Sequence, residues 1–130
     1  MRHCLLIPLL LGLALPAAAT TERSRVLVMG KPAGWQVAEY ADDAGLSVHY
    51  EYADRGRGPS LDVRYTFLSY GRVGSVDLGG VNYMKVPVQE AFAREGAAAR
   101  WRNGAEEARR DDAAAAFYLG LDRVPEDTVL

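Results

Sequence analysis

Cysteine and histidine are scarce in this sequence of 130 residues. Cys4 is the only cysteine, and His3 and His49 are the only histidines. A catalytic metal site needs several histidines or carboxylates that converge on one ion, and no acidic residues here show a calcium-loop spacing. The sequence therefore predicts no metal ligand and no cofactor-binding residue.

Long apolar runs are also scarce, and the one at the amino end is typical of an export signal. Arg2 lies in a short basic start, Leu5–Leu15 is apolar, and the small residues Ala17–Ala19 precede Thr20. The run is shorter than the ~20 residues that span a membrane. We expect a cleaved signal peptide over residues 1–19 and a periplasmic or extracellular protein, with an uncleaved membrane anchor as the alternative.

The mature chain is expected to be one domain without disulfides. Cleavage before Thr20 removes 19 of the 130 residues, and the 111 that remain contain no cysteine. A chain of this length can bury a modest core. Cys4 lies ahead of the apolar run and not just after it, so we expect no lipid anchor. The domain over residues 20–130 would therefore have to fold in an oxidising compartment without disulfides.

No sign of charge dominates the mature chain. Without Arg2 it has 14 basic and 17 acidic residues, a net charge of about −3 with histidine neutral. Because the two signs are dispersed, the composition does not favour nucleic acid or an anionic membrane surface as a partner. We also expect no stable membrane insertion once the signal peptide is removed.

Alternation of apolar and polar residues predicts a mainly β fold. Leu46–Tyr52 and Leu61–Phe67 alternate strictly, and Trp35–Tyr40 alternates large apolar residues with small or polar ones. Further candidates are Arg25–Met29, Val73–Tyr83, Val86–Glu95, Ala97–Trp101 and Ala116–Leu121. Short loops that contain glycine favour antiparallel neighbours. We expect a curved antiparallel meander of about seven or eight strands.

Three segments interrupt the alternation. Residues 104–115 are rich in alanine and charge and are predicted to form a short helix or a loop. The pair Gly79-Gly80 suggests a bulge or a bend. Val124–Leu130 resembles the first turn of a helix. Because the sequence stops there, either these last residues dock onto the sheet or the chain is the front part of a longer protein.

The sequence does not place a serine nucleophile within hydrogen-bonding distance of a histidine base. Ser47 and Glu51 share a strand face with His49, but side chains two residues apart lie about 6–7 Å from each other, too far for a proton relay. Ser75 lacks the second glycine of a nucleophile elbow. The pattern favours a solvated face, and no catalytic residue is predicted.

The stretch from Asp54 to Pro59, DRGRGP, most resembles a binding site. Arg55, Arg57 and nearby backbone amides could contact a carboxylate or phosphate. However, the stretch lacks the lysine and hydroxyl of a P-loop and precedes a strand. A hairpin turn needs the same glycine and proline. The residues favour a turn, with Arg55 and Arg57 as candidate contacts to an anion or a substrate carboxylate.

Most of the aromatic residues fall in the predicted strands. They could line a curved sheet and receive an apolar ligand, but at a spacing of two they more often form the core. The residues concerned are Trp35, Tyr40, Tyr50, Tyr52, Tyr65, Phe67, Tyr83, Phe92, Trp101, Phe117 and Tyr118. We therefore expect these aromatic residues to form the core of the domain.

Five blocks carry a family resemblance: Gly34–Val37, Val48–Pro59, Gly80–Val88, Ala99–Glu107 and Ala116–Tyr118. In this order they resemble the amino-terminal region of secreted bacterial amidohydrolase-family proteins, over residues 26–127. The most specific element is the DRGRGP stretch with its flanking tyrosines. The resemblance implies a metal-dependent TIM-barrel hydrolase as intramolecular partner, with a divalent metal such as zinc bound in that domain, which is absent from this chain.

The catalytic motifs of that family do not occur here. They comprise a His-x-His pair, further histidines, a carboxylate and often a bridging lysine around one or two metals, so no catalytic or metal-binding residue carries over. The resemblance implies a non-catalytic amino-terminal module, or truncated copy, of an exported amidohydrolase-family enzyme. The alternative is a free-standing periplasmic module that binds an apolar or peptide ligand on its curved sheet.

Overall fold

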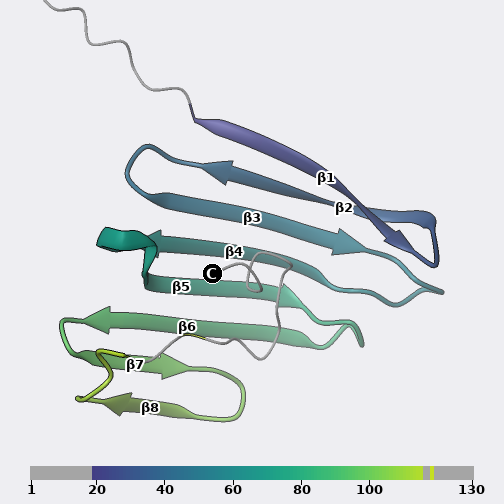
Figure 1. The fold of residues 1–130 in the computed structure, drawn as a ribbon. Helices are drawn as coiled ribbons and strands as arrows, with labels where there is room; N and C mark the ends of the chain where they lie inside the picture. The colour runs from purple at the N-terminus through teal and green to yellow at the C-terminus, as the bar shows by residue number, and fades with distance from the viewer. Residues whose placement is uncertain (1–18, 116–117, 119–130) are drawn as a thin grey trace, which may run out of the picture.

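The structure, a computed structural model, describes residues 19–115 and Tyr118. Eight strands form one sheet in chain order, and all neighbours are antiparallel (Figure 1). They are β1 (Thr20–Val28), β2 (Lys31–Tyr40), β3 (Gly45–Tyr52), β4 (Ser60–Phe67), β5 (Val73–Val81), β6 (Pro87–Glu95), β7 (Ala98–Arg102) and β8 (Glu107–Arg110). This confirms the predicted antiparallel meander.

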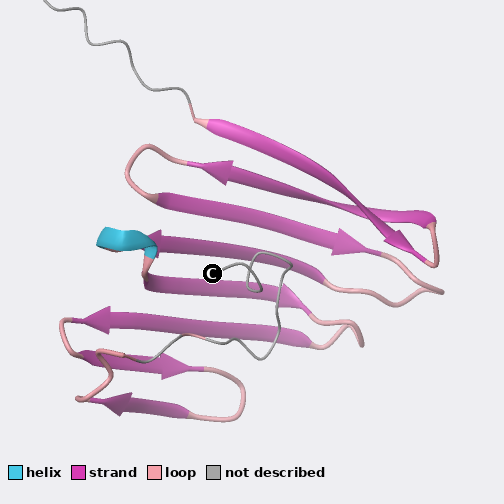
Figure 2. Ribbon diagram, viewed as in Figure 1, coloured by secondary structure: helices cyan, strands magenta, loops and turns pink. Residues whose placement is uncertain are grey.

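Helical structure among the described residues is limited to one 3-10 turn, η1 (Ser69–Gly71), between β4 and β5 (Figure 2). No helix in this part of the chain has the length and apolar character to cross a membrane. The predicted signal peptide lies almost wholly outside the described residues. The predicted strand Ala116–Leu121, apart from Tyr118, and the predicted helical turn at Val124–Leu130 lie outside them as well.

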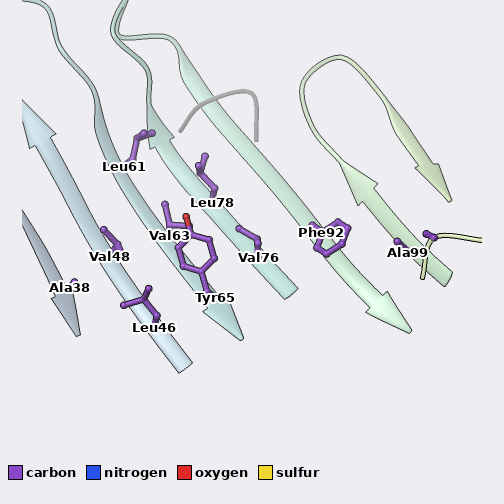
Figure 3. Packing of buried hydrophobic residues seen from close by; sticks show 11 residues of the cluster. Ala38, Leu46, Val48, Leu61, Val63, Tyr65, Val76, Leu78, Phe92 and Ala99 are labelled. Atoms are coloured by element: carbon purple, nitrogen blue, oxygen red, sulfur yellow. The ribbon is translucent and has the colours of Figure 1, made fainter. Parts of the chain in front are cut away.

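The register of the strands separates an apolar face from a polar face. Directly opposed residues share a face of the sheet, and Val48 is opposite both Ala38 on β2 and Val63 on β4. Figure 3 shows this cluster, which spans β2 to β7. Its buried members are Ala38, Leu46, Val48, Leu61, Val63, Tyr65, Val76, Leu78, Phe92, Ala99 and Ala113. We call this side the core face and the opposite side the polar face.

After β8, Ala113 and Tyr118 pack against the core face. The Ala113 amide donates to the Ala97 carbonyl oxygen (2.8 Å), and Arg94 Nη1 donates to the Ala113 carbonyl oxygen (2.6 Å). Further along, the Tyr118 hydroxyl donates to Glu90 Oε2 (3.0 Å), and its ring lies 5.1 Å from that of Phe92. These contacts attach a covering segment to the apolar side of β6.

The prediction of a helix or loop over residues 104–115 is wrong in its centre, where β8 forms. This strand pairs with Ala99–Arg102 of β7. Its backbone amides and carbonyls are therefore hydrogen-bonded to a neighbouring strand, whereas those of a solvated loop would be bonded to water. Asn103 makes the tight turn before it, because its Oδ1 accepts from the amides of Ala105 and Glu106. Only the flanks of the segment are loop.

Trp35 is an exception to the expected aromatic core. It lies on the polar face together with Val37, while Gln36 and Ala38 are buried on the core face. The cause is the register with β3, in which the strict alternation of that strand places Val48 in the core and therefore also its partner Ala38.

Gly79 and Gly80 do not form the suggested bulge, because β5 pairs with β4 without interruption at both residues. Gly80 is nevertheless required by its backbone. Its φ is +139°, and a Cβ there would lie 2.1 Å from the Ser60 carbonyl oxygen. A Cβ at Gly79 would meet nothing within 4 Å.

These adjacent glycines give a matched test of the fold. We expect Gly80→Ala to lower the free energy of unfolding by at least about 2 kcal/mol, because the backbone conformation and the clash both oppose a side chain. Gly79→Ala should change it by less than about 1 kcal/mol. Urea unfolding followed by circular dichroism measures both variants, and equal losses would contradict the register of β4 and β5.

Candidate functional site

The DRGRGP stretch forms a tight hairpin turn. The amides of Asp54 and Arg57 each donate to the other's carbonyl oxygen, at 2.7 and 2.9 Å. Between them, Arg55 (φ 52°) and Gly56 (φ 80°) both have the positive φ that a two-residue type I′ hairpin requires. The turn interpretation is confirmed, and it engages two of the amides that an anion-binding loop would have offered to its ligand.

The two arginines of this turn extend into solvent. The Arg55 side chain is 87% exposed, and its Nε lies 3.9 Å from Asp54 Oδ1. Arg57 is exposed and forms no ion pair within residues 19–115 and 118. Within the described chain, no hydrogen bond holds a further basic group beside the two arginines. Contact of Arg55 and Arg57 with an anion therefore stays a prediction.

The β1–β2, β3–β4 and β5–β6 turns lie next to one another at the same end of the sheet, and the β7–β8 turn follows them along that end (Figure 1). Backbone bonds join the first three hairpins in series. The Ala53 amide donates to the Ala33 carbonyl oxygen (3.0 Å), and the Gly58 amide donates to that of Tyr83 (3.1 Å). The Tyr83 hydroxyl also donates to Asp54 Oδ2 (3.3 Å). The β3–β4 turn is therefore bonded directly to the β5–β6 turn, and to the first hairpin through Ala33 on β2.

We define the hairpin end as residues 27–31, 53–58 and 82–86. It contains five of the large apolar side chains that are exposed in the structure: Leu27, Met29, Tyr83, Met84 and Val86. Met29 is 89% exposed, Met84 58% and Val86 53%. Single exposed apolar residues are common on proteins, but a group of them on neighbouring turns indicates a contact surface.

Charge at the hairpin end is mainly of one sign. Lys31, Arg55, Arg57 and Lys85 are basic, and Asp54 is the only acidic residue in the three segments. Asp54 is half-buried and accepts the bond from Tyr83, so it is less accessible than the basic groups. The chain as a whole is slightly acidic, which makes this local basic excess distinctive.

On the polar face, His49 lies between two carboxylates. Its Nδ1 is 2.7 Å from Asp62 Oδ1, and its Nε2 is 3.6 Å from Glu51 Oε2. Glu51 was expected on this face but too far from His49 for a proton relay. Its long side chain brings the carboxylate to within 3.6 Å of the imidazole. Asp62 was missed because it lies on β4, and only the register places it opposite His49. Among the described residues, no hydrogen bond joins Ser47 to His49. The imidazole is therefore not placed to take a proton from the Ser47 hydroxyl.

The same carboxylates continue toward the edge of the sheet. Trp35 Nε1 donates a hydrogen bond to Glu51 Oε1, and the Arg23 guanidinium lies 3.8 Å from the centre of the Trp35 ring. We call Arg23, Trp35, Glu51, His49 and Asp62 the polar network. It links side chains of β1, β2, β3 and β4 on the polar face.

Other predicted site features remain separate. The Ser75 hydroxyl is hydrogen-bonded to that of Thr66 (2.7 Å), and no hydrogen bond among the described residues joins it to a histidine or a carboxylate. Within residues 19–115 and 118, no group of three or more histidine, cysteine, aspartate or glutamate side chains is arranged to hold a metal ion.

Comparison with protein-family models, with characterised proteins and with solved structures finds no match to this chain.

The polar network predicts a pH dependence. The hydrogen bond with Asp62 raises the pKa of His49 above its ordinary value of 6.5, and partial burial opposes this rise. A raised pKa in the folded state means that the stabilisation is complete below about pH 6.5 and is lost as the pH rises through the folded-state pKa. Because both side chains are partly exposed, we expect less than about 1 kcal/mol.

Asp62→Asn tests this dependence. The variant should lower the pKa of His49, measured by NMR titration of the imidazole protons, and reduce the stability lost between about pH 5.5 and pH 8.5. Asp77→Asn on the same face, which does not contact His49, should leave the titration unchanged. An unchanged titration curve in Asp62→Asn would show that the two side chains do not interact in solution.

Proposed function

We propose that this chain is a non-catalytic docking module, the amino-terminal part of an exported amidohydrolase-family hydrolase. Its partner would be a metal-dependent barrel that binds the divalent metal and performs catalysis. The observation that carries the proposal is the hairpin end, where exposed apolar side chains lie on three hairpins that are bonded to one another. The resemblance of residues 26–127 to such proteins supplies the class of partner.

A docking role fits the physical character of the hairpin end. Protein interfaces combine an apolar centre with a polar rim and exclude water best when the surface is already ordered. Met29 and Met84 supply adaptable apolar contacts, while Arg55 and Lys85 surround them with positive charge. The surface that it contacts should therefore be apolar with acidic residues around it.

The apolar face of the sheet is less suited to a ligand. Its side chains belong to the core cluster, and Ala113 and Tyr118 of the same chain pack against it. Tyr65 in its centre has no exposed surface at all. A ligand there would have to displace the covering segment, so this arrangement favours docking through the hairpin end over binding of an apolar ligand by the sheet.

The first test is to extend the gene product beyond residue 130 and to assay zinc binding and hydrolysis in the long and short forms. The proposal expects a barrel with a His-x-His motif downstream, and metal binding and activity in the long form alone. A catalytic metal bound by residues 20–130, or a downstream sequence without such a barrel, would refute it.

Substitution of the hairpin end then tests the surface. In the long form, Met29→Ser combined with Met84→Ser should separate the thermal unfolding of the module from that of the barrel and expose their junction to proteolysis, because apolar contacts are lost. The control is Tyr70→Ser, since Tyr70 is fully exposed at the opposite end of the sheet. Docking elsewhere would be indicated if the control separated the domains and the double variant did not.

A further inference from the structure

A trough runs along β5 and β6 on the polar face. Its floor includes the small residues Gly79 on β5 and Ala91 and Ala93 on β6. Two adjoining hollows of about 560 and 670 Å³ share Asp77, Ala91 and Arg102. The open space above Gly79 agrees with this shape, because a Cβ there would contact nothing. The trough is separate from the hairpin end, so the inference below does not depend on the proposed docking role.

One cross-strand row brings three charged residues to the middle of the trough, and Glu39 on β2 and Glu107 on β8 lie further out in the same row. Arg64 on β4 is opposite Asp77 on β5, Asp77 is opposite Ala91 on β6, and Ala91 is opposite Arg102 on β7. Because Ala91 has only a methyl group, space remains between Asp77 and Arg102. Between Glu39 and Glu107 the row therefore presents positive, negative and positive charge in sequence, with the small Ala91 in its middle.

These three charges differ from their neighbours on the polar face. His49 is bonded to Asp62, and Arg100 and Arg109 both lie near Glu95, at 3.3 and 3.6 Å. By contrast, none of the three trough residues forms an ion pair within residues 19–115 and 118. Their charges are available to a ligand without first breaking an internal contact.

We infer that the trough binds a small molecule with two carboxylates and an amino group, the chemistry of an acidic amino acid or a short acidic peptide. Each guanidinium can bind a carboxylate through two parallel hydrogen bonds. Asp77 accepts hydrogen bonds from the ammonium group that lies between them. The same aspartate repels an anion that lacks the amino group, so it discriminates against phosphate and simple dicarboxylates.

Titration of the purified chain with L-glutamate, followed by amide NMR shifts or calorimetry, tests the inference. Because the trough is open to solvent, we expect a dissociation constant of about 0.1–1 mM. Arg64→Gln and Arg102→Gln should each weaken binding about tenfold. Arg25→Gln is the matched control, because Arg25 is exposed on the same face, on β1, and forms no ion pair in the described chain.

Two further comparisons separate the inferred ligand from other anions. Asp77→Asn should weaken binding of glutamate and strengthen binding of glutarate, which lacks the amino group. Gly79→Val should fill the floor and abolish binding while the circular dichroism spectrum is retained. The inference is overturned if glutamate does not saturate the chain up to about 20 mM, if the arginine variants bind as the unmodified chain does, or if phosphate binds as tightly as glutamate.

Discussion

The covering of one face of a single sheet is the constraint on which the rest of this structure depends. An antiparallel sheet can leave one face in water, but its apolar face has to be buried to stabilise the fold. Here described residues after β8 contribute cover, anchored by hydrogen bonds from Arg94 to the Ala113 carbonyl oxygen and from Arg72 to the Ala114 carbonyl oxygen. Ala113 and Tyr118 thereby pack against the core cluster, whereas the polar face and the ends of the strands stay open to solvent.

The two free edges of the sheet are protected against pairing with other chains. On β1 the charged residues Glu22, Arg23 and Arg25 follow one another closely, and β8 is short and carries Glu107 and two arginines. Charged and short edge strands discourage the addition of a further strand. This protection favours contact through the turns at the hairpin end over contact through backbone pairing at an edge.

Much of this fold could be predicted from local sequence, and the exceptions have a common cause. Leu46–Tyr52 and Leu61–Phe67 were placed correctly because one face of each strand is buried and the alternation reports it. Trp35 was misplaced, and Asp62 was missed beside His49, because both depend on register with another strand. The turn at Asp54–Arg57 could be predicted from its glycine. The hydrogen bonds from Ala53 to Ala33 and from Gly58 to Tyr83, which join it to the neighbouring hairpins, depend on loop geometry that local patterns do not contain.

The position of β1 connects the polar network with the hairpin end. None of the nine residues of β1 is buried, so core packing contributes little to holding this strand. It is held by backbone pairing with β2 and by Arg23, which lies over Trp35 and so joins the polar network. The turn that follows β1 carries Met29, the most exposed apolar residue of the hairpin end. A loosened polar network should therefore loosen this part of the hairpin end, although His49 and Met29 lie on different segments.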